Sequence, residues 1–136
     1  MADLSITASN VGIGSTGVIS LVQVGETVTA GQPAYKKSTD GLYYKADANA
    51  SSATAAALGV FLTGASTNGY AVLCTAGSYL AGATLTVGET YVVSATAGGI
   101  APLADVTTGW YVTILGVASS ATTLVLDIVR SGTARA

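Results

Sequence analysis

The chain has 136 residues, of which half are hydrophobic and only 9% are charged, and its five lysine and arginine residues against seven acidic residues give a formal net charge of −2. This length suits a single domain, and the acidic balance argues against a nucleic-acid-binding protein, which needs a basic patch. The charged fraction lies well below the roughly 25% of an average soluble domain, which indicates that partner subunits cover much of the surface.

The composition predicts an all-β fold. Small and β-branched residues dominate, whereas glutamate, lysine, arginine and glutamine are scarce. β-branched side chains fit a pleated sheet and glycine favours tight turns, while the scarce residues are those that favour helices. We therefore expect short strands joined by tight turns.

The first 22 residues have a mixed pattern. Leu4, Ile6 and Ala8 alternate with polar residues, which predicts a short strand, and residues 18–22 predict a second strand. A glycine-rich stretch, residues 12–17, lies between them. We expect residues 1–22 to form an extended N-terminal arm or an edge hairpin outside the main body.

The body of the chain, residues 23–136, contains an internal duplication. Four runs in the first half match four runs in the second: residues 28–35 with 85–92, 41–47 with 99–105, 58–60 with 115–117, and 71–74 with 124–127. The first three pairs are offset by 57 or 58 positions and the last by a few fewer. Conserved order and spacing predict one β domain built from two half-repeats, about residues 24–77 and 81–132.

Each half-repeat is predicted to hold four short strands, the first of which ends at Gly31 or Gly88. Glycine-containing turn signals follow at residues 38–41, 66–69 and 97–99, where tight hairpins need backbone of positive φ. Strands at this spacing predict a compact barrel or a sandwich. The alanine-rich residues 50–57 favour helix, but their repeat partner alternates like a strand, so we expect a loop leading into a strand, with a short helical turn as the alternative.

No residue predicts a catalytic, cofactor-binding or metal site, so the chain is predicted not to be an enzyme. Histidine is absent, which removes Ser-His-Asp and Cys-His catalysis and the commonest transition-metal ligand. The single cysteine, Cys74, lies in an apolar run, where a buried and inert thiol is expected. The string Gly12-x-Gly14-x-x-Gly17 matches the dinucleotide fingerprint only in its letters, because a strand pattern rather than a helix follows it.

The carboxylates have simpler explanations than catalysis. Glu26 and Glu89 both lie in Val-Gly-Glu-Thr turns, and Asp47 and Asp105 both follow an alanine at a strand end. Equivalent positions in two half-repeats indicate turn hydrogen bonds rather than the facing pair of a glycosidase. The N-terminal residues lack the pattern of a signal peptide and no apolar stretch is long enough to span a membrane, so we expect synthesis and assembly in the cytoplasm without a membrane partner.

Several of these runs together resemble one family. Residues 29–35, 40–47, 85–94, 97–102 and 110–118 resemble the head decoration, or cement, proteins of tailed phages, and the resemblance covers most of residues 29–128. It implies a non-enzymatic virion protein that binds the major capsid protein on the capsid exterior, as a homo-oligomer and most commonly a trimer, and stabilises the shell. In that role residues 1–22 would be an arm that pairs with the capsid protein or a neighbouring subunit, with residues 12–17 as its hinge.

Two other functions remain as alternatives. One is a phage tail, baseplate or head-fibre component. The other is a surface carbohydrate-binding β module, which would use outward aromatic side chains such as Trp110 or Tyr43.

Overall fold

The computed structural model describes residues 3–136, and Met1 and Ala2 lie outside the described residues. In the described part, ten strands form one sheet in the order β4–β3–β5–β6–β10–β9–β7–β8, with β1 and β2 both paired with β6. The predicted mostly β fold is confirmed. The strands are β1 (Val11–Ile13), β2 (Val18–Gln23), β3 (Pro33–Lys36), β4 (Tyr43–Lys45), β5 (Gly59–Phe61), β6 (Tyr70–Ala81), β7 (Thr90–Val93), β8 (Ile100–Pro102), β9 (Tyr111–Ala118) and β10 (Thr123–Ala134).

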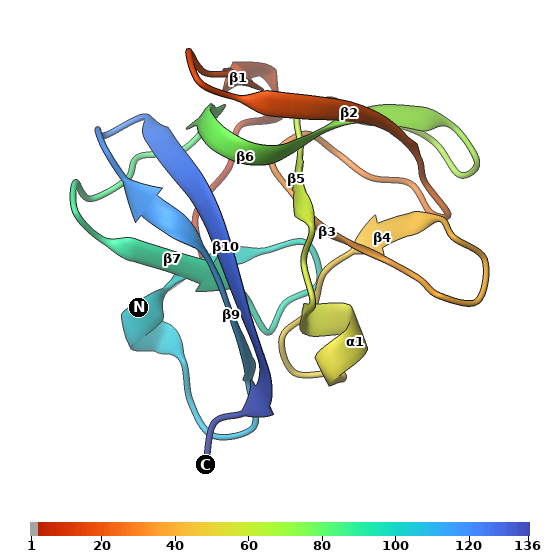
Figure 1. Ribbon diagram of the computed structural model, residues 1–136. Helices are drawn as coiled ribbons and strands as arrows, with labels where there is room; N and C mark the ends of the chain where they lie inside the picture. Colours follow the sequence, from red (N-terminus) through yellow and green to blue (C-terminus); the bar gives the residue numbers. More distant parts are fainter. Residues whose placement is uncertain (1–2) are drawn as a thin grey trace.

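The sheet is open and curls like half of a barrel. Figure 1 shows β2 and β6 crossing the top, with β7, β9 and β10 on the left and β3, β4 and β5 on the right. Its two end strands, β4 and β8, are not paired with each other. Single backbone hydrogen bonds connect the regions beside them instead: Gly98 donates to the carbonyl of Ala46, and Ala48 donates to that of Ser94.

The predicted tight turns are confirmed where glycine or asparagine takes the left-handed backbone. The β3–β4 hairpin turns at Gly41, with φ of 72°, and the β7–β8 hairpin at Gly98, with φ of 79°. Asn68, before β6, has φ of 67° and is the one non-glycine residue of positive φ among residues 3–136. These backbone values are the ones that glycine and asparagine tolerate.

The alanine-rich segment contains the short helical turn that the sequence left as the alternative. Helix α1 (Ser52–Ala55) begins at a capping box in which Ser51 Oγ accepts the backbone N–H of Thr54 and Thr54 Oγ1 accepts that of Ser51. The buried hydroxyl of Thr113 on β9 donates to the carbonyl of Ala55 and connects the helix to the sheet. Strand β5 follows, as expected.

Three strand predictions are wrong. Residues 4–8 form no strand, because the amides of Leu4 and Thr7 donate to two different partners, Ile100 and Gly82, instead of one ladder. A 3₁₀ helix, η1 (Ala8–Asn10), follows them. The strands expected to end at Gly31 and Gly88 are also absent, and both glycines lie in turns with φ of 95° and 83°.

Residues 11–23 pair with a strand of the same chain and form an edge of the sheet that is interrupted once. Strands β1 and β2 pair one after the other with the two ends of β6. The glycine-rich turn between them is held by Gly14, which donates to the carbonyl of Ser78, and by Thr16, whose hydroxyl bonds to Ser78 Oγ. Whether this segment also reaches another chain stays a prediction.

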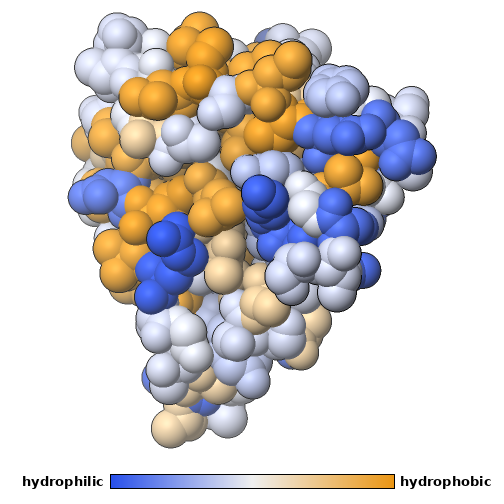
Figure 2. Space-filling view, turned by 45° about the vertical axis from the view of Figure 1, so that its right-hand side comes forward, coloured by the Kyte–Doolittle hydropathy of each residue, from blue (hydrophilic) through white to orange (hydrophobic). Residues whose placement is uncertain are grey.

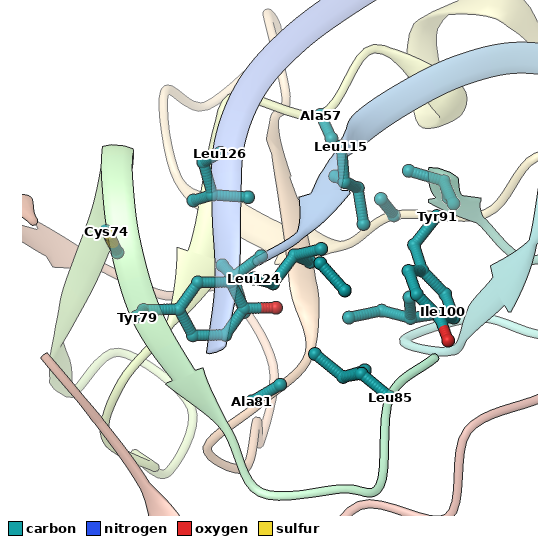
Figure 3. Packing of buried hydrophobic residues seen from close by; sticks show 14 of the residues in the cluster. Ala57, Cys74, Tyr79, Ala81, Leu85, Tyr91, Ile100, Leu115, Leu124 and Leu126 are labelled. Atoms are coloured by element: carbon teal, nitrogen blue, oxygen red, sulfur yellow. The ribbon is translucent and has the colours of Figure 1, made fainter. Parts of the chain in front are cut away.

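The core divides into three clusters because the sheet buries side chains on both faces. Along β5, Val60 packs in the largest cluster and its neighbour Phe61 in the second, as the alternation of a strand requires. The largest cluster lies inside the curl and draws on β5–β10; Figure 3 shows Tyr79, Leu124 and Ile100 within it. The third cluster, around Val92, lies on the other face of β7 and β8.

Candidate functional site

Several of the seven carboxylates serve hydrogen bonds of turns and loops. Asp40 accepts the amide of Leu42 at 2.9 Å and the hydroxyl of Tyr44 at 2.5 Å. The Tyr44 hydrogen bond is the main cause that lowers the pKa of Asp40, and the same bond raises the pKa of Tyr44 to about 12. This pair fixes the β3–β4 hairpin.

Glu26, Asp47, Glu89 and Asp105 each lie in a separate turn or loop. Glu26 accepts the amide of Lys45 at 2.9 Å and lies 3.9 Å from its ammonium group. Asp47 accepts the amide of Asn49 at 3.1 Å. Glu89 follows the turn at Gly88, and Asp105 ends the 3₁₀ helix η2 (Leu103–Asp105) after β8. Among residues 3–136, no three His, Cys, Asp or Glu side chains gather as a metal-binding group.

Cys74 and the glycine string Gly12-x-Gly14-x-x-Gly17 both have structural roles. The Cys74 side chain is buried in the largest core cluster, and desolvation raises the pKa of its thiol. Gly12 belongs to β1, and after Gly17 the chain continues directly as β2. The glycine string is therefore followed by a strand. It lacks the helix N-terminus that binds the pyrophosphate group of a dinucleotide.

The most unusual surface feature is the apolar edge, which we define as Val18, Ile19 and Leu21 of β2. Their side chains are 54%, 50% and 69% exposed, and Ser20 between them is exposed as well. Side chains on a strand alternate between two faces, so both faces of β2 are open here. Figure 2 shows hydrophobic residues gathered across the upper half of the molecule, where Figure 1 places β2 and β6.

The backbone of the apolar edge is open on one side. β2 pairs with β6 along one edge, and no strand of the described chain pairs with the other. Residues 4–25 contain no charged side chain and no proline. Natural sheets normally protect such an edge with lysine, proline or a covering segment. The sequence predicted the strand but not its exposure, because an apolar run such as Val-Ile-Ser-Leu ordinarily indicates a buried strand.

A second apolar surface lies on β9 and β10. Val117 and Val125 are cross-strand partners, 43% and 37% exposed, and Val129 farther along β10 is 55% exposed. We call these three side chains the β9–β10 patch. This patch belongs to different strands from the apolar edge.

Trp110 lies at a polar hollow. A cavity of about 530 Å³ is lined by Trp110 together with Asp3, Ser94, Thr96 and Asp105. The Asp3 carboxylate accepts the Ser94 hydroxyl at 2.6 Å. The Trp110 ring is half-buried against two core clusters. Tyr43 is also half-buried and packs against the second cluster, so neither aromatic side chain stands fully outward.

A comparison of the chain with protein-family models and with curated protein sequences finds no match. In the described part of the chain, no helix is long and apolar enough to cross a membrane.

Proposed function

We propose that this chain is a non-enzymatic structural protein of a phage virion, which binds the outer surface of the capsid and stabilises it. The sequence resemblance to head decoration proteins suggests the family. The observation that carries the proposal is the apolar edge, because an open and uncharged edge strand suits a structural partner better than solvent.

The apolar edge offers two kinds of interaction at once. Its unpaired backbone groups can accept an extended segment of the major capsid protein by strand addition. Val18, Ile19 and Leu21 are only 54%, 50% and 69% exposed, so covering what remains of each side chain contributes roughly 1–2 kcal/mol. Together these contributions suit a permanent contact with a shell.

The resemblance to decoration proteins also implies contacts between copies of the chain. We assign this role to the β9–β10 patch, because it is separate from the apolar edge and presents Val117 and Val125 side by side. The resemblance suggests a trimer. The protein would be assembled in the host cytoplasm and located on the capsid exterior, without nucleic-acid or membrane partners.

We also propose that the fold is built from two half-repeats. The strand order is the same when read from either end: β4–β3–β5–β6 is followed by β10–β9–β7–β8. The pairings support this. Ala34 pairs with Lys45 and Gly59, and Tyr91, 57 positions later, pairs with Pro102 and Gly116, each also 57 positions later. Residues 3–22 lie outside both half-repeats, and their strands β1 and β2 add to the sheet by pairing with β6.

A pelleting experiment tests the proposal. Purified protein is mixed with undecorated capsids, assembled from the major capsid protein whose gene lies nearest, and sedimented. We expect the wild type to pellet at a fixed ratio, and the double variant Ile19→Lys/Leu21→Lys to stay in the supernatant with an unchanged melting temperature. The matched control Val87→Lys alters an equally exposed side chain elsewhere, 65% exposed, and should pellet normally.

Two outcomes of that experiment would contradict the proposal. The first is a wild-type protein that stays in the supernatant with its own capsids. The second is a double variant that pellets as the wild type does, which would assign the contact to another surface.

The Trp110 hollow supports a carbohydrate-binding module as the second candidate. An aromatic ring beside carboxylate and hydroxyl groups suits a sugar, which offers an apolar face and hydroxyl groups. A glycan array tests this candidate. Binding that is lost in a folded Trp110→Ala variant and kept in Tyr43→Ala would favour it, and an array without signal would reject it.

A further inference from the structure

A second hollow gathers most of the positive charge of the chain. A cavity of about 470 Å³ lies between the β3–β4 hairpin, α1 and β10, and Lys36, Lys37 and Arg130 line it. They are three of the five cations in the chain, although the chain as a whole is acidic. None of its lining residues in the described part of the chain is acidic. The sequence did not show this cluster, because Arg130 is far from the two lysines along the chain.

Two of the three cations, Arg130 and Lys37, make contacts that position them. Arg130 Nη1 donates to the carbonyl of Ala57 at 3.1 Å, which anchors the guanidinium beside α1. A guanidinium carries five N–H donors, so one such bond does not exhaust it. The Lys37 ammonium lies 5.0 Å from the centroid of the Tyr44 ring, a cation–π contact.

The nearest acidic group on the hairpin is already engaged. Asp40 accepts Leu42 N and the Tyr44 hydroxyl, which turns its carboxylate toward its own hairpin. It offsets part of the local positive charge through its interaction with Lys37, but three cations line the hollow. The hollow therefore keeps an excess of positive charge.

Besides the polar Ser38, Thr39 and Thr54, the rest of the lining includes apolar side chains. Tyr35, Ala56 and Leu58 contribute half-buried side chains to the same hollow. A small inorganic anion would use the cations but would leave this apolar lining uncovered. A peptide that carries both carboxylates and small aliphatic side chains would use both.

We propose that this hollow binds an acidic segment of a partner protein, with aspartate or glutamate side chains on Lys36, Lys37 and Arg130 and small apolar side chains on Tyr35 and Leu58. Charge complementarity selects the acidic partner, and the apolar lining selects a peptide over a free anion. The inference is independent of the apolar edge and stands whether or not the chain binds a capsid.

NMR titration of the ¹⁵N-labelled full chain tests this site. The probe is the peptide acetyl-(Ala-Glu)₄-amide, and its neutral control is acetyl-(Ala-Gln)₄-amide. We expect the acidic peptide to shift the amides of residues 35–39, 53–58 and 130, with weaker binding as salt rises. The neutral peptide should leave them unchanged.

Two double variants give the matched comparison. Lys36→Ala/Lys37→Ala removes two exposed cations of the hollow and should weaken peptide binding about tenfold. Lys45→Ala/Arg135→Ala removes the same charge outside the hollow and should keep the affinity within about twofold.

Several results would overturn the inference. Equal shifts with the acidic and neutral peptides, or equal loss in the two double variants, would mean that the hollow does not select carboxylates. Inorganic phosphate or an oligonucleotide that binds the same residues more tightly than the peptide would assign another ligand. Shifts of these amides that depend on protein concentration alone would assign the hollow to a second copy of the chain.

Discussion

Tyr79 and Tyr91 are nearly fully buried in the same core cluster but differ in their hydroxyl groups. The Tyr91 hydroxyl accepts the amide of Thr86 at 3.0 Å. The Tyr79 hydroxyl, directed into the cluster in Figure 3, has no hydrogen-bond partner among the described residues. Burial of this group raises the pKa of Tyr79, and an unpaired buried hydroxyl lowers the stability of the fold.

This contrast predicts opposite effects for the same chemical change. Tyr79→Phe should raise the free energy of unfolding by about 1 kcal/mol, because it removes an unpaired polar group. Tyr91→Phe should lower it by about 1 kcal/mol, because the amide of Thr86 loses its acceptor. Urea denaturation followed by circular dichroism measures both, and equal losses in the two variants would contradict this account of the core.

The Asp40–Tyr44 pair predicts a pH dependence in the hairpin. The folded pKa of Asp40 is lowered, so its contribution to stability is present above the unfolded pKa of about 3.9 and is lost as the pH falls through the folded value. The folded pKa of Tyr44 is raised to about 12, so its contribution is present below the unfolded value of about 10 and is lost as the pH rises through about 12.

NMR titration of the Asp40 side-chain carboxyl tests this pair. In Tyr44→Phe the pKa of Asp40 should rise toward its ordinary value, because the main hydrogen bond to the carboxylate is gone. Tyr43→Phe is the control and should leave the pKa of Asp40 unchanged. If the pKa of Asp40 is the same in Tyr44→Phe as in the wild type, the hydrogen bond from Tyr44 is not the cause of its lowered value.

At the scale of the strand, two glycines occupy matching positions in β5 and β9. A Cβ atom on Gly59 would overlap the carbonyl oxygen of Cys74, and one on Gly116 would overlap that of Val125. In both cases the obstacle is the backbone of the neighbouring strand, which cannot rotate away. Close approach of two backbones explains both glycines.

These glycines predict two equivalent variants. Gly59→Ala and Gly116→Ala should each lower the free energy of unfolding by about 2 kcal/mol or more, because the strands must separate. Gly12→Ala is the control: its Cβ would meet only Leu80 Cδ1, at 3.8 Å, and it should cost less than about 0.5 kcal/mol. The midpoints of urea denaturation measure these effects. A wild-type midpoint for Gly59→Ala or Gly116→Ala would contradict the close approach of the two backbones.

The sequence predicts elements where local chemistry determines them. Asp40–Gly41 and Asn68–Gly69 indicate turns because few residues tolerate positive φ, and both turns are present. Residues 4–8 mislead because their alternation reflects packing of Leu4 and Ile6 on the core, while their amides bond to separate partners. Alternation reports which side chains are buried and says nothing of whether a ladder forms.

At the scale of the whole molecule, the surfaces depend on contacts between distant parts of the chain. Residues 18–22 are predictable as a strand, but their open edge follows from their pairing with β6 about fifty residues later. The cationic hollow joins Lys36 and Lys37 to Arg130 through the position of β10 beside α1. Neither surface can be read from local sequence, because each needs the strand order of the sheet.

The proposed function requires that the open edge of β2 pairs with an extended segment of the capsid protein. Hydrogen–deuterium exchange of the free and capsid-bound protein tests it most directly. We expect those amides of residues 18–22 that point away from β6 to exchange at least about tenfold more slowly in the bound state, because new ladder hydrogen bonds protect them. A capsid-bound protein whose β2 amides exchange as fast as in the free chain would contradict it.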